Sequence, residues 1–176
     1  QPVSLDSPGT ALELGIATVF QDLALCENLD VVSNLFLGHE IDPWALDEVQ
    51  MEVRAWTLLQ ELAARIPSVR EPIASLSGGQ RQTVAIARSL LLDPKIIMLD
   101  EPSRGIDIGA KAEVFRLLAE RARDGLAVLY STSEVSECLS IAHRIIVMHK
   151  GRISAEFGPD ATKEQIMAAS GESVAA

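Results

Sequence analysis

The fold is decided by residues 75–102, SLSGGQRQTVAIARSLLLDPKIIMLDEP. Ser77 predicts the start of a helix and Asp93-Pro94 its end, because serine caps helix N-termini and proline cannot continue a helix. The apolar run at residues 95–99 then predicts a parallel strand that is buried on both faces. A capped helix followed directly by such a strand favours an α/β core.

Both ends of this stretch suit chemistry on a phosphate. The helix opens on a hydroxyl, two glycines and an amide, namely Ser77, Gly78, Gly79 and Gln80. Glycine lets a backbone approach a ligand closely, and the free N–H groups and the helix dipole favour an anion there. The strand ends at a carboxylate, Asp100, a candidate Mg²⁺ ligand, and Glu101 follows as a candidate to orient or deprotonate water. Each feature alone also fits an ordinary capped helix or acidic turn; their pairing favours the functional interpretation.

The rest of the chain alternates between short β-rich runs and helical patterns. Further strands are predicted at residues 16–20, 126–130, 144–148 and 152–157, and helices at residues 31–36, 45–66, 110–123, 134–142 and after Thr162, whose capping box includes Gln165. The helix at 45–66 is expected to bury its apolar positions at helical spacing: Val49, Val53, Trp56, Leu59 and Ala63. The pattern predicts an α/β core with an inserted helical subdomain.

The composition and charge of the chain argue against some classes of function. Aromatic residues make up 4% of the chain and the net charge is −10, which argues against a nucleic-acid surface. Apolar runs stay well short of 18 residues, so the sequence predicts a soluble chain. It begins at Gln1 rather than at methionine, and we expect a piece of a longer protein.

The motifs resemble those of the nucleotide-binding subunit of an ABC transporter, within the carbohydrate-importer group. LSGGQ at 76–80 matches the family signature, and IIMLDEP at 96–102 matches the Walker B strand with its glutamate. VFQD at 19–22 resembles the Q-loop and GID at 105–107 the D-loop. Two further stretches, NLFLG at 34–38 and SRGIDIGAK at 103–111, are similar to segments of simple-sugar importers.

This resemblance implies a role for each matching residue. Glu101 and Gln21 would be catalytic, and Asp100 and Gln21 would reach Mg²⁺. The expected ATP-contacting residues are those of the signature and D-loop: Ser77, Gly78, Gly79, Gln80 and Asp107.

The same resemblance implies a fold and its divisions. The fold would be a P-loop NTPase-like cassette core with an inserted helical subdomain. Its expected parts are a core remnant (1–21), the helical subdomain (22–93), the catalytic core (94–160) and a C-terminal helix and tail (161–176).

Partners and location also follow from the resemblance alone. Such a subunit binds ATP and Mg²⁺, pairs with a second nucleotide-binding domain in a homo- or pseudo-dimer, and contacts transmembrane permease subunits. An extracytoplasmic sugar-binding protein would be an indirect partner. The subunit would lie in the cytoplasm, peripheral on the inner face of the cell membrane.

Three departures from the family pattern are visible. No G-x-x-x-x-G-K-[ST] motif occurs in the chain; in the family this loop precedes the Q-loop, so here it would precede Gln1. Ser133 stands where the family has its switch histidine. Residues 16–102 resemble single or first-half cassettes, whereas residues 103–170 resemble second halves of ribose-type tandem proteins.

Two functions therefore remain open. The first is the ATPase subunit of a sugar importer, although residues 1–176 alone are expected to be inactive without the phosphate-binding loop. The second is a degenerate, non-hydrolysing cassette that donates its LSGGQ signature to a partner's ATP site. A non-transport ABC protein of DNA repair or translation is disfavoured, because the chain has neither long coiled coils nor a basic surface.

Overall fold

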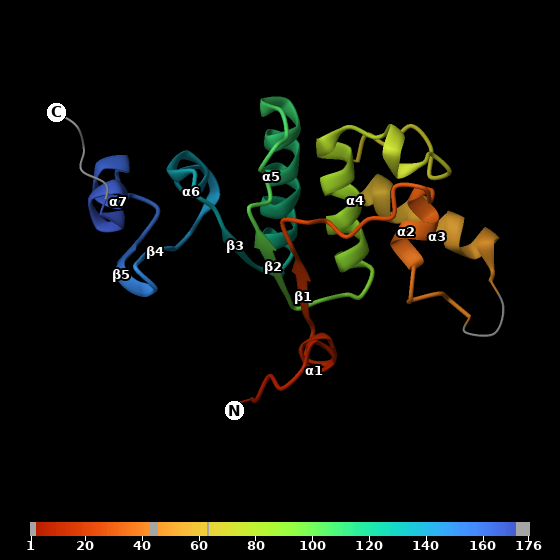
Figure 1. Cartoon of the computed structure of the whole chain (residues 1–176), viewed down its shortest axis with the longest axis horizontal. Coiled ribbons are helices and arrows are strands. Elements are labelled where there is room, and N and C mark those ends of the chain that lie inside the picture. Colours follow the sequence, from red (N-terminus) through yellow and green to blue (C-terminus); the bar gives the residue numbers. More distant parts are fainter. Residues whose placement is uncertain (1–2, 43–45, 63, 172–176) are drawn as a thin grey trace. The chain divides into compact units, whose positions relative to one another are not determined.

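The computed structural model describes residues 3–42, 46–62 and 64–171, in two units, residues 1–131 and 132–176 (Figure 1). The elements of the first unit are α1 Pro8–Glu13, β1 Ile16–Val19, α2 Val31–Phe36, α3 Glu48–Glu61, η1 Ile73–Ser75, α4 Gly78–Leu90, β2 Ile96–Asp100, α5 Ile108–Arg123 and β3 Ala127–Ser131. Those of the second are α6 Val135–Ile141, β4 Ile145–His149, β5 Arg152–Phe157 and α7 Lys163–Ser170. The predicted α/β class is confirmed.

A parallel sheet in the order β1-β2-β3 organises the first unit. Val19 lies beside Leu99, and Leu99 lies beside Tyr130, so all three strands end at the same edge. The helices α4 and α5 contact each other, and they pack on β1 and β3 respectively. The sheet thus brings the segments after β1, β2 and β3 together.

The predicted burial of the central strand on both faces was wrong. Ile97 and Leu99 are buried, whereas the alternating Ile96 and Met98 are 36% and 38% exposed. Leu129 of β3, in register with Met98, is exposed as well. The apolar run was compatible with two covered faces, but the helices of this unit pack on the face that carries Ile97 and Leu99.

The predicted inner face of α3 was also wrong, with Leu59 as the exception. Val49 and Val53 are 73% and 62% exposed, and Trp56 is exposed too. The buried residues instead form a second stripe at helical spacing: Met51, Ala55 and Leu59. Both stripes are apolar, and packing against α2 selects the second. Residue 45, where the helix was predicted to begin, and Ala63, the last of its predicted buried positions, lie outside the described residues, and α3 ends at Glu61 rather than at the predicted residue 66.

Asn34 fixes the connection between β1 and α2. Its side chain is fully buried. Its amide oxygen accepts from the Cys26 N–H at 2.7 Å, and its amide nitrogen donates to the carbonyls of Cys26 and Asp30 at 3.0 and 2.9 Å. A buried amide can replace missing secondary structure in this way: it provides the acceptor for the Cys26 N–H and adds a second donor to carbonyls that already accept from backbone N–H groups.

The first turns of α4 and α5 touch at Gly79. A Cβ atom built on Gly79 would lie 2.2 Å from the Cβ of Ala110, far inside van der Waals contact. A Cβ on Gly78 would lie 3.3 Å from Cγ2 of Ile106. Gly79, which the sequence indicated for phosphate contact, is therefore also required by the packing of the two helices, whereas Gly78 lies close to the segment that precedes α5.

The second unit is a hairpin with two helices. β4 and β5 pair antiparallel across a turn in which Lys150 and Gly151 both have positive φ, as a two-residue type I′ hairpin turn requires. Ile145 and Val147 of β4 and Ile166 of α7 form its core. The predicted capping box of Thr162 and Gln165 is confirmed.

We predict that Asn34→Ala lowers the free energy of unfolding by about 1–3 kcal/mol, because it removes a fully buried amide and leaves the N–H of Cys26 without its hydrogen-bond acceptor. Urea unfolding of the chain measures the change. Asn28→Ala, at an exposed position of the same connection, is the control and should change stability by at most about 0.5 kcal/mol. Equal losses in both variants would contradict the role of Asn34.

We predict that Gly79→Ala lowers the free energy of unfolding by about 1–3 kcal/mol, because the new methyl group overlaps that of Ala110. The double variant Gly79→Ala/Ala110→Gly should regain most of this loss, since the next nearest atom, Ala110 Cα, lies at 3.4 Å. A double-mutant cycle of urea midpoints measures the coupling. Strictly additive effects would show that the helices do not depend on this contact.

Candidate functional site

Three predicted residues lie where strands of the parallel sheet end. Asp100 is the last residue of β2, Glu101 follows it, and Gln21 lies two residues beyond β1. Because Val19 and Leu99 are paired in register, Gln21 and Glu101 continue from matched positions on neighbouring strands. The carboxyl edge of a parallel sheet is where α/β folds bind ligands. We call these three residues the sheet-edge cluster.

Asp100 is oriented by the neighbouring strand. It lies beside Ser131 in the β2–β3 register, and the Ser131 hydroxyl donates a hydrogen bond to the Asp100 carboxylate. Ser131 was not predicted as a site residue, since its contact with Asp100 depends on strand register. The carboxylate remains exposed at the edge, so a cation can reach it.

Glu101 adopts an unusual backbone conformation. Its φ is +47°, in the left-handed region that residues with a side chain seldom occupy. Hydrogen bonds on both sides hold it there: its N–H donates to the Ser131 carbonyl at 3.0 Å, and its carbonyl accepts from the Arg104 N–H at 3.1 Å. Such conformations cost about 1 kcal/mol or more and concentrate at active sites. The geometry is consistent with the predicted importance of Glu101.

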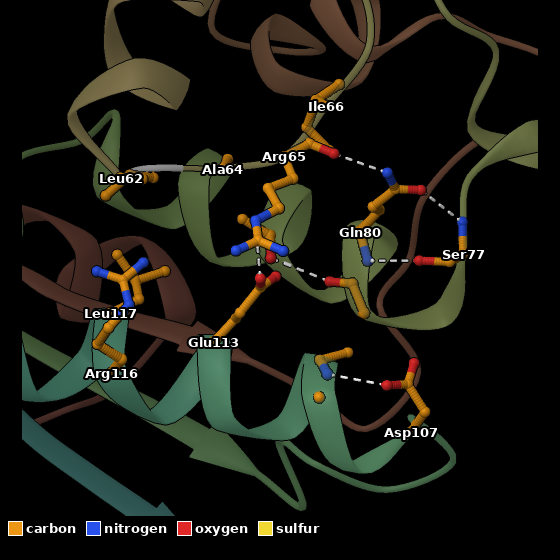
Figure 2. A pocket seen from close by; sticks show the side chains of 14 residues that line it. Leu62, Ala64, Arg65, Ile66, Ser77, Gln80, Asp107, Glu113, Arg116 and Leu117 are labelled. Atoms are coloured by element: carbon orange, nitrogen blue, oxygen red, sulfur yellow. Dashed lines mark hydrogen bonds and ion pairs between the residues drawn. The ribbon is translucent and has the colours of Figure 1, made fainter.

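The signature residues surround a separate cleft. It has a volume of about 310 Å³ and lies between the N-terminal turns of α4 and α5 and the segment after α3 (Figure 2). The predicted residues that line it are Ser77, Gly79, Gln80 and Asp107. Asp107 caps α5 by accepting from the Ala110 N–H at 3.0 Å. We call this the signature cleft.

Gln80 stabilises the signature through hydrogen bonds of its backbone and side chain. Its backbone N–H donates to Ser77 Oγ at 3.3 Å, and its Oε1 accepts from the Ser77 N–H at 2.9 Å, which completes a capping box. Its Nε2 donates to the Arg65 carbonyl at 2.7 Å (Figure 2). The side-chain amide therefore joins the start of α4 to the segment that follows α3.

Two charged residues at the signature cleft were not predicted. Arg65 Nε lies 3.1 Å from Glu113 Oε1, and both side chains line the cleft (Figure 2). The Arg65 side chain is 84% exposed, so this ion pair contributes little to stability. A single sequence carries no signal for it, because the partners are far apart along the chain.

The loop that leads to the signature is held by Arg70. Its guanidinium contacts three carboxylates, those of Asp30, Glu48 and Glu52, at 2.9–3.3 Å. Burial alone would raise the pKa of Asp30, but hydrogen bonds from Ser33 and Arg70 outweigh it and lower the pKa below its usual value. The contribution of Asp30 to stability is therefore present above its unfolded-state pKa and is lost as the pH falls through the lowered value.

The predicted residues thus form two groups. The sheet-edge cluster does not line the signature cleft, and Gly78 contacts the D-loop segment instead of lining the cleft. Within residues 3–42, 46–62 and 64–171, no group of three or more His, Cys, Asp or Glu side chains gathers as a metal site would. The oxygen donors of the sheet-edge cluster do fit Mg²⁺, which is commonly bound by one or two carboxylates together with phosphates and water.

Comparison with known proteins agrees with these motifs. Residues 4–104 match the ABC transporter family. Ribose import ATP-binding protein RbsA 2 of Rhizobium meliloti is 42% identical over 153 residues, which cover 85% of this chain and 29% of that protein. RbsA 1 of Streptomyces coelicolor is 37% identical over 176 residues, covering 96% and 35%. The chain spans about a third of the length of these relatives.

Solved structures show the same fold. cbiO1 from Clostridium perfringens, part of the ABC transporter complex cbiONQ, has a TM-score of 0.75 at 26% identity, with 96% of this chain and 65% of that chain covered. The ATP-binding cassette MJ0796, a dimer in a post-hydrolysis state with ADP and Pi, has a TM-score of 0.73 at 25% identity, with 90% and 70% covered. The predicted cassette fold is confirmed, and the chain belongs to the ABC transporter family.

Proposed function

We propose that this chain is part of the ATP-binding and ATP-hydrolysing subunit of an ABC-type sugar importer, which couples ATP hydrolysis to carbohydrate uptake. The observation that carries the proposal is the presence, in one unit, of the sheet-edge cluster and the signature cleft. The sugar class is supported by the relatives that are named as ribose import proteins.

In this proposal the sheet-edge cluster works on a nucleotide bound to the same subunit. Asp100, oriented by Ser131, and Gln21 would hold Mg²⁺, which neutralises phosphate charge. Glu101 would orient and deprotonate the attacking water, and its tightly held backbone limits the positions of its carboxylate. Catalysis of phosphoryl transfer depends chiefly on such positioning.

The signature cleft would act on a second nucleotide-binding domain. The N–H groups of the first turn of α4, with Ser77, Gly78, Gly79 and Gln80, would contact ATP held by the partner cassette, and Asp107 would lie at the interface. A homo- or pseudo-dimer is supported by the dimeric MJ0796 structure. The clear separation of the two groups within this chain also suits such an arrangement.

The subunit would associate with permease subunits on the inner face of the cell membrane and would serve an extracytoplasmic sugar-binding protein indirectly. Among the described helices, none has both the length and the apolar character that crossing a membrane requires. The proposal includes the predicted parts of the chain: a core remnant (1–21), a helical subdomain (22–93), a catalytic core (94–160) and a C-terminal helix and tail (161–176).

The degenerate cassette is the second candidate. Ser133 occupies the position of the family's switch histidine and cannot act as an imidazole would in hydrolysis. A cassette of this kind would keep the signature cleft and would lend it to an active partner. Nucleotide affinity and turnover of the full-length protein separate the two candidates.

We predict that Glu101→Gln in the full-length protein retains ATP binding and lowers kcat about 10²-fold or more, because the amide cannot take a proton from water. Steady-state hydrolysis and ATP titration measure the two effects. Glu120→Gln is the matched control, since the Glu120 side chain pairs with Arg116 one turn away at the surface of α5, and it should leave kcat unchanged.

Two results would decide against the proposal. Full turnover in Glu101→Gln would remove Glu101 from catalysis. Tight Mg-ATP binding by the unaltered full-length protein without any turnover would favour the degenerate cassette.

We predict that residues 1–176 alone show no ATPase activity above background and bind Mg-ATP weakly. The sheet-edge cluster offers carboxylates to Mg²⁺, but this sequence contains no G-x-x-x-x-G-K-[ST] loop to hold the β- and γ-phosphates in line. Isothermal titration calorimetry and a phosphate-release assay measure both properties. Micromolar affinity, or turnover that Glu101→Gln abolishes, would reveal a different phosphate site within this chain.

A further inference from the structure

Arg88 connects the signature helix to the loop that carries Gln21. Arg88 lies near the C-terminal end of α4, and its side chain is half-buried. Nη1 donates to the carbonyl of Ala24 and Nη2 to the carbonyl of Leu23, both at 2.8 Å. These partners precede Arg88 by more than sixty residues in the chain. The contact therefore joins α4 to the loop after β1, and the sequence did not predict this contact.

The loop that Arg88 holds is sharply bent. Residues 22–25 follow Gln21 directly as the chain leaves β1 and passes α4 toward α2 (Figure 1). Ala24 has φ +48°, a left-handed conformation that residues with a Cβ disfavour, and its N–H donates to Asp22 Oδ1 at 3.2 Å. The bend lets two successive carbonyls face the same guanidinium.

We propose that Arg88 is a positioning residue for Gln21: by holding the carbonyls of Leu23 and Ala24, it keeps Gln21 at the edge of the sheet beside Asp100 and Glu101. This inference rests on the proposed function, in which Gln21 reaches Mg²⁺. Arg88 itself lies outside the sheet-edge cluster and acts through the backbone of the loop.

The same contact connects the two groups of site residues. Ser77 caps α4 at the signature cleft, and Arg88 lies eleven positions further along the same helix, about 16 Å away at 1.5 Å per residue. A displacement of α4 at its first turn would therefore reach the loop of Gln21 along the helix and through Arg88. Engagement of the signature by a second cassette would in this way adjust the nucleotide site of the chain that provides the signature.

The contact requires arginine in particular. A guanidinium offers two parallel N–H donors in one plane, which match two successive carbonyl oxygens, whereas an ammonium group is a single point of charge. Partial burial lowers the pKa of the Arg88 guanidinium, an effect that the nearby Cys26 opposes, and arginine remains charged at neutral pH. Lysine at this position would keep the charge and lose the paired geometry.

The test compares Arg88→Met, Arg88→Lys and a control in the full-length protein. The control is Arg121→Lys, since Arg121 also donates from a helix to a distant backbone carbonyl, that of Glu61, at 3.2 Å, but does so far from Gln21 in the sequence. Three quantities are measured for each variant: kcat, the Mg²⁺ concentration at half-maximal turnover, and hydrogen exchange of the amides in residues 22–25.

In Arg88→Met we expect faster exchange in residues 22–25, a kcat lowered about 10- to 100-fold and a half-saturating Mg²⁺ concentration raised about tenfold, because the misplaced Gln21 weakens the metal site. Arg88→Lys should fall between Arg88→Met and the unaltered protein, and Arg121→Lys should match the unaltered protein. A merely structural role would reduce the amount of folded enzyme without changing its Mg²⁺ dependence. If Arg88→Met does not fold, Arg88→Lys carries the test.

The possible failures are distinguishable. If the unaltered protein does not hydrolyse ATP, the proposed function fails, and the inference about Gln21 fails with it. If the unaltered protein is active but the Arg88 variants keep its Mg²⁺ dependence and kcat, the positioning role is overturned and the proposed function stands. Unchanged exchange in residues 22–25 would likewise overturn it.

Discussion

The close approach of α4 and α5 at Gly79 and Ala110 is the contact on which the site depends. Because no side chain separates the two first turns, the signature at the start of α4 and Asp107 at the start of α5 share one cleft. The same helices pack on the sheet that carries Asp100. A larger residue at Gly79 would therefore disturb the cleft and the support of the sheet together. Glycine at this position serves helix packing in addition to the ligand access proposed for the motif.

α4 is held by polar contacts at both of its ends. Gln80 joins its first turn to the Arg65 carbonyl, and Arg88 joins its last turns to the loop after β1. Between these contacts the helix buries most of one face. A displacement of the helix would therefore affect both neighbouring segments, which would suit an element between the two proposed nucleotide sites.

Local signals in the sequence predicted most of the elements and the motif residues. Helix starts at Asp30, Ser77 and Thr162 were predictable because a capping side chain bonds to a backbone N–H within three residues. Contacts between distant segments were not predictable from one sequence. Three features depend on which segments the fold brings together. They are the apolar stripe of α3 that is buried, the hydrogen bond from Ser131 to Asp100, and the hydrogen bonds from Arg88 to backbone carbonyls.

The pairing of β1 with β2 has a consequence for synthesis on the ribosome. Ile16 lies beside Ile96, so about eighty residues must be added before the first strand meets its neighbour. At ordinary elongation rates this takes roughly 4–16 s. During that interval Ala17 and Val19, which are buried in the finished sheet, cannot yet pair with β2. The side of β1 that pairs with β2 therefore stays unpaired for seconds, and an apolar strand edge of this kind is a target for chaperones that bind extended apolar peptides.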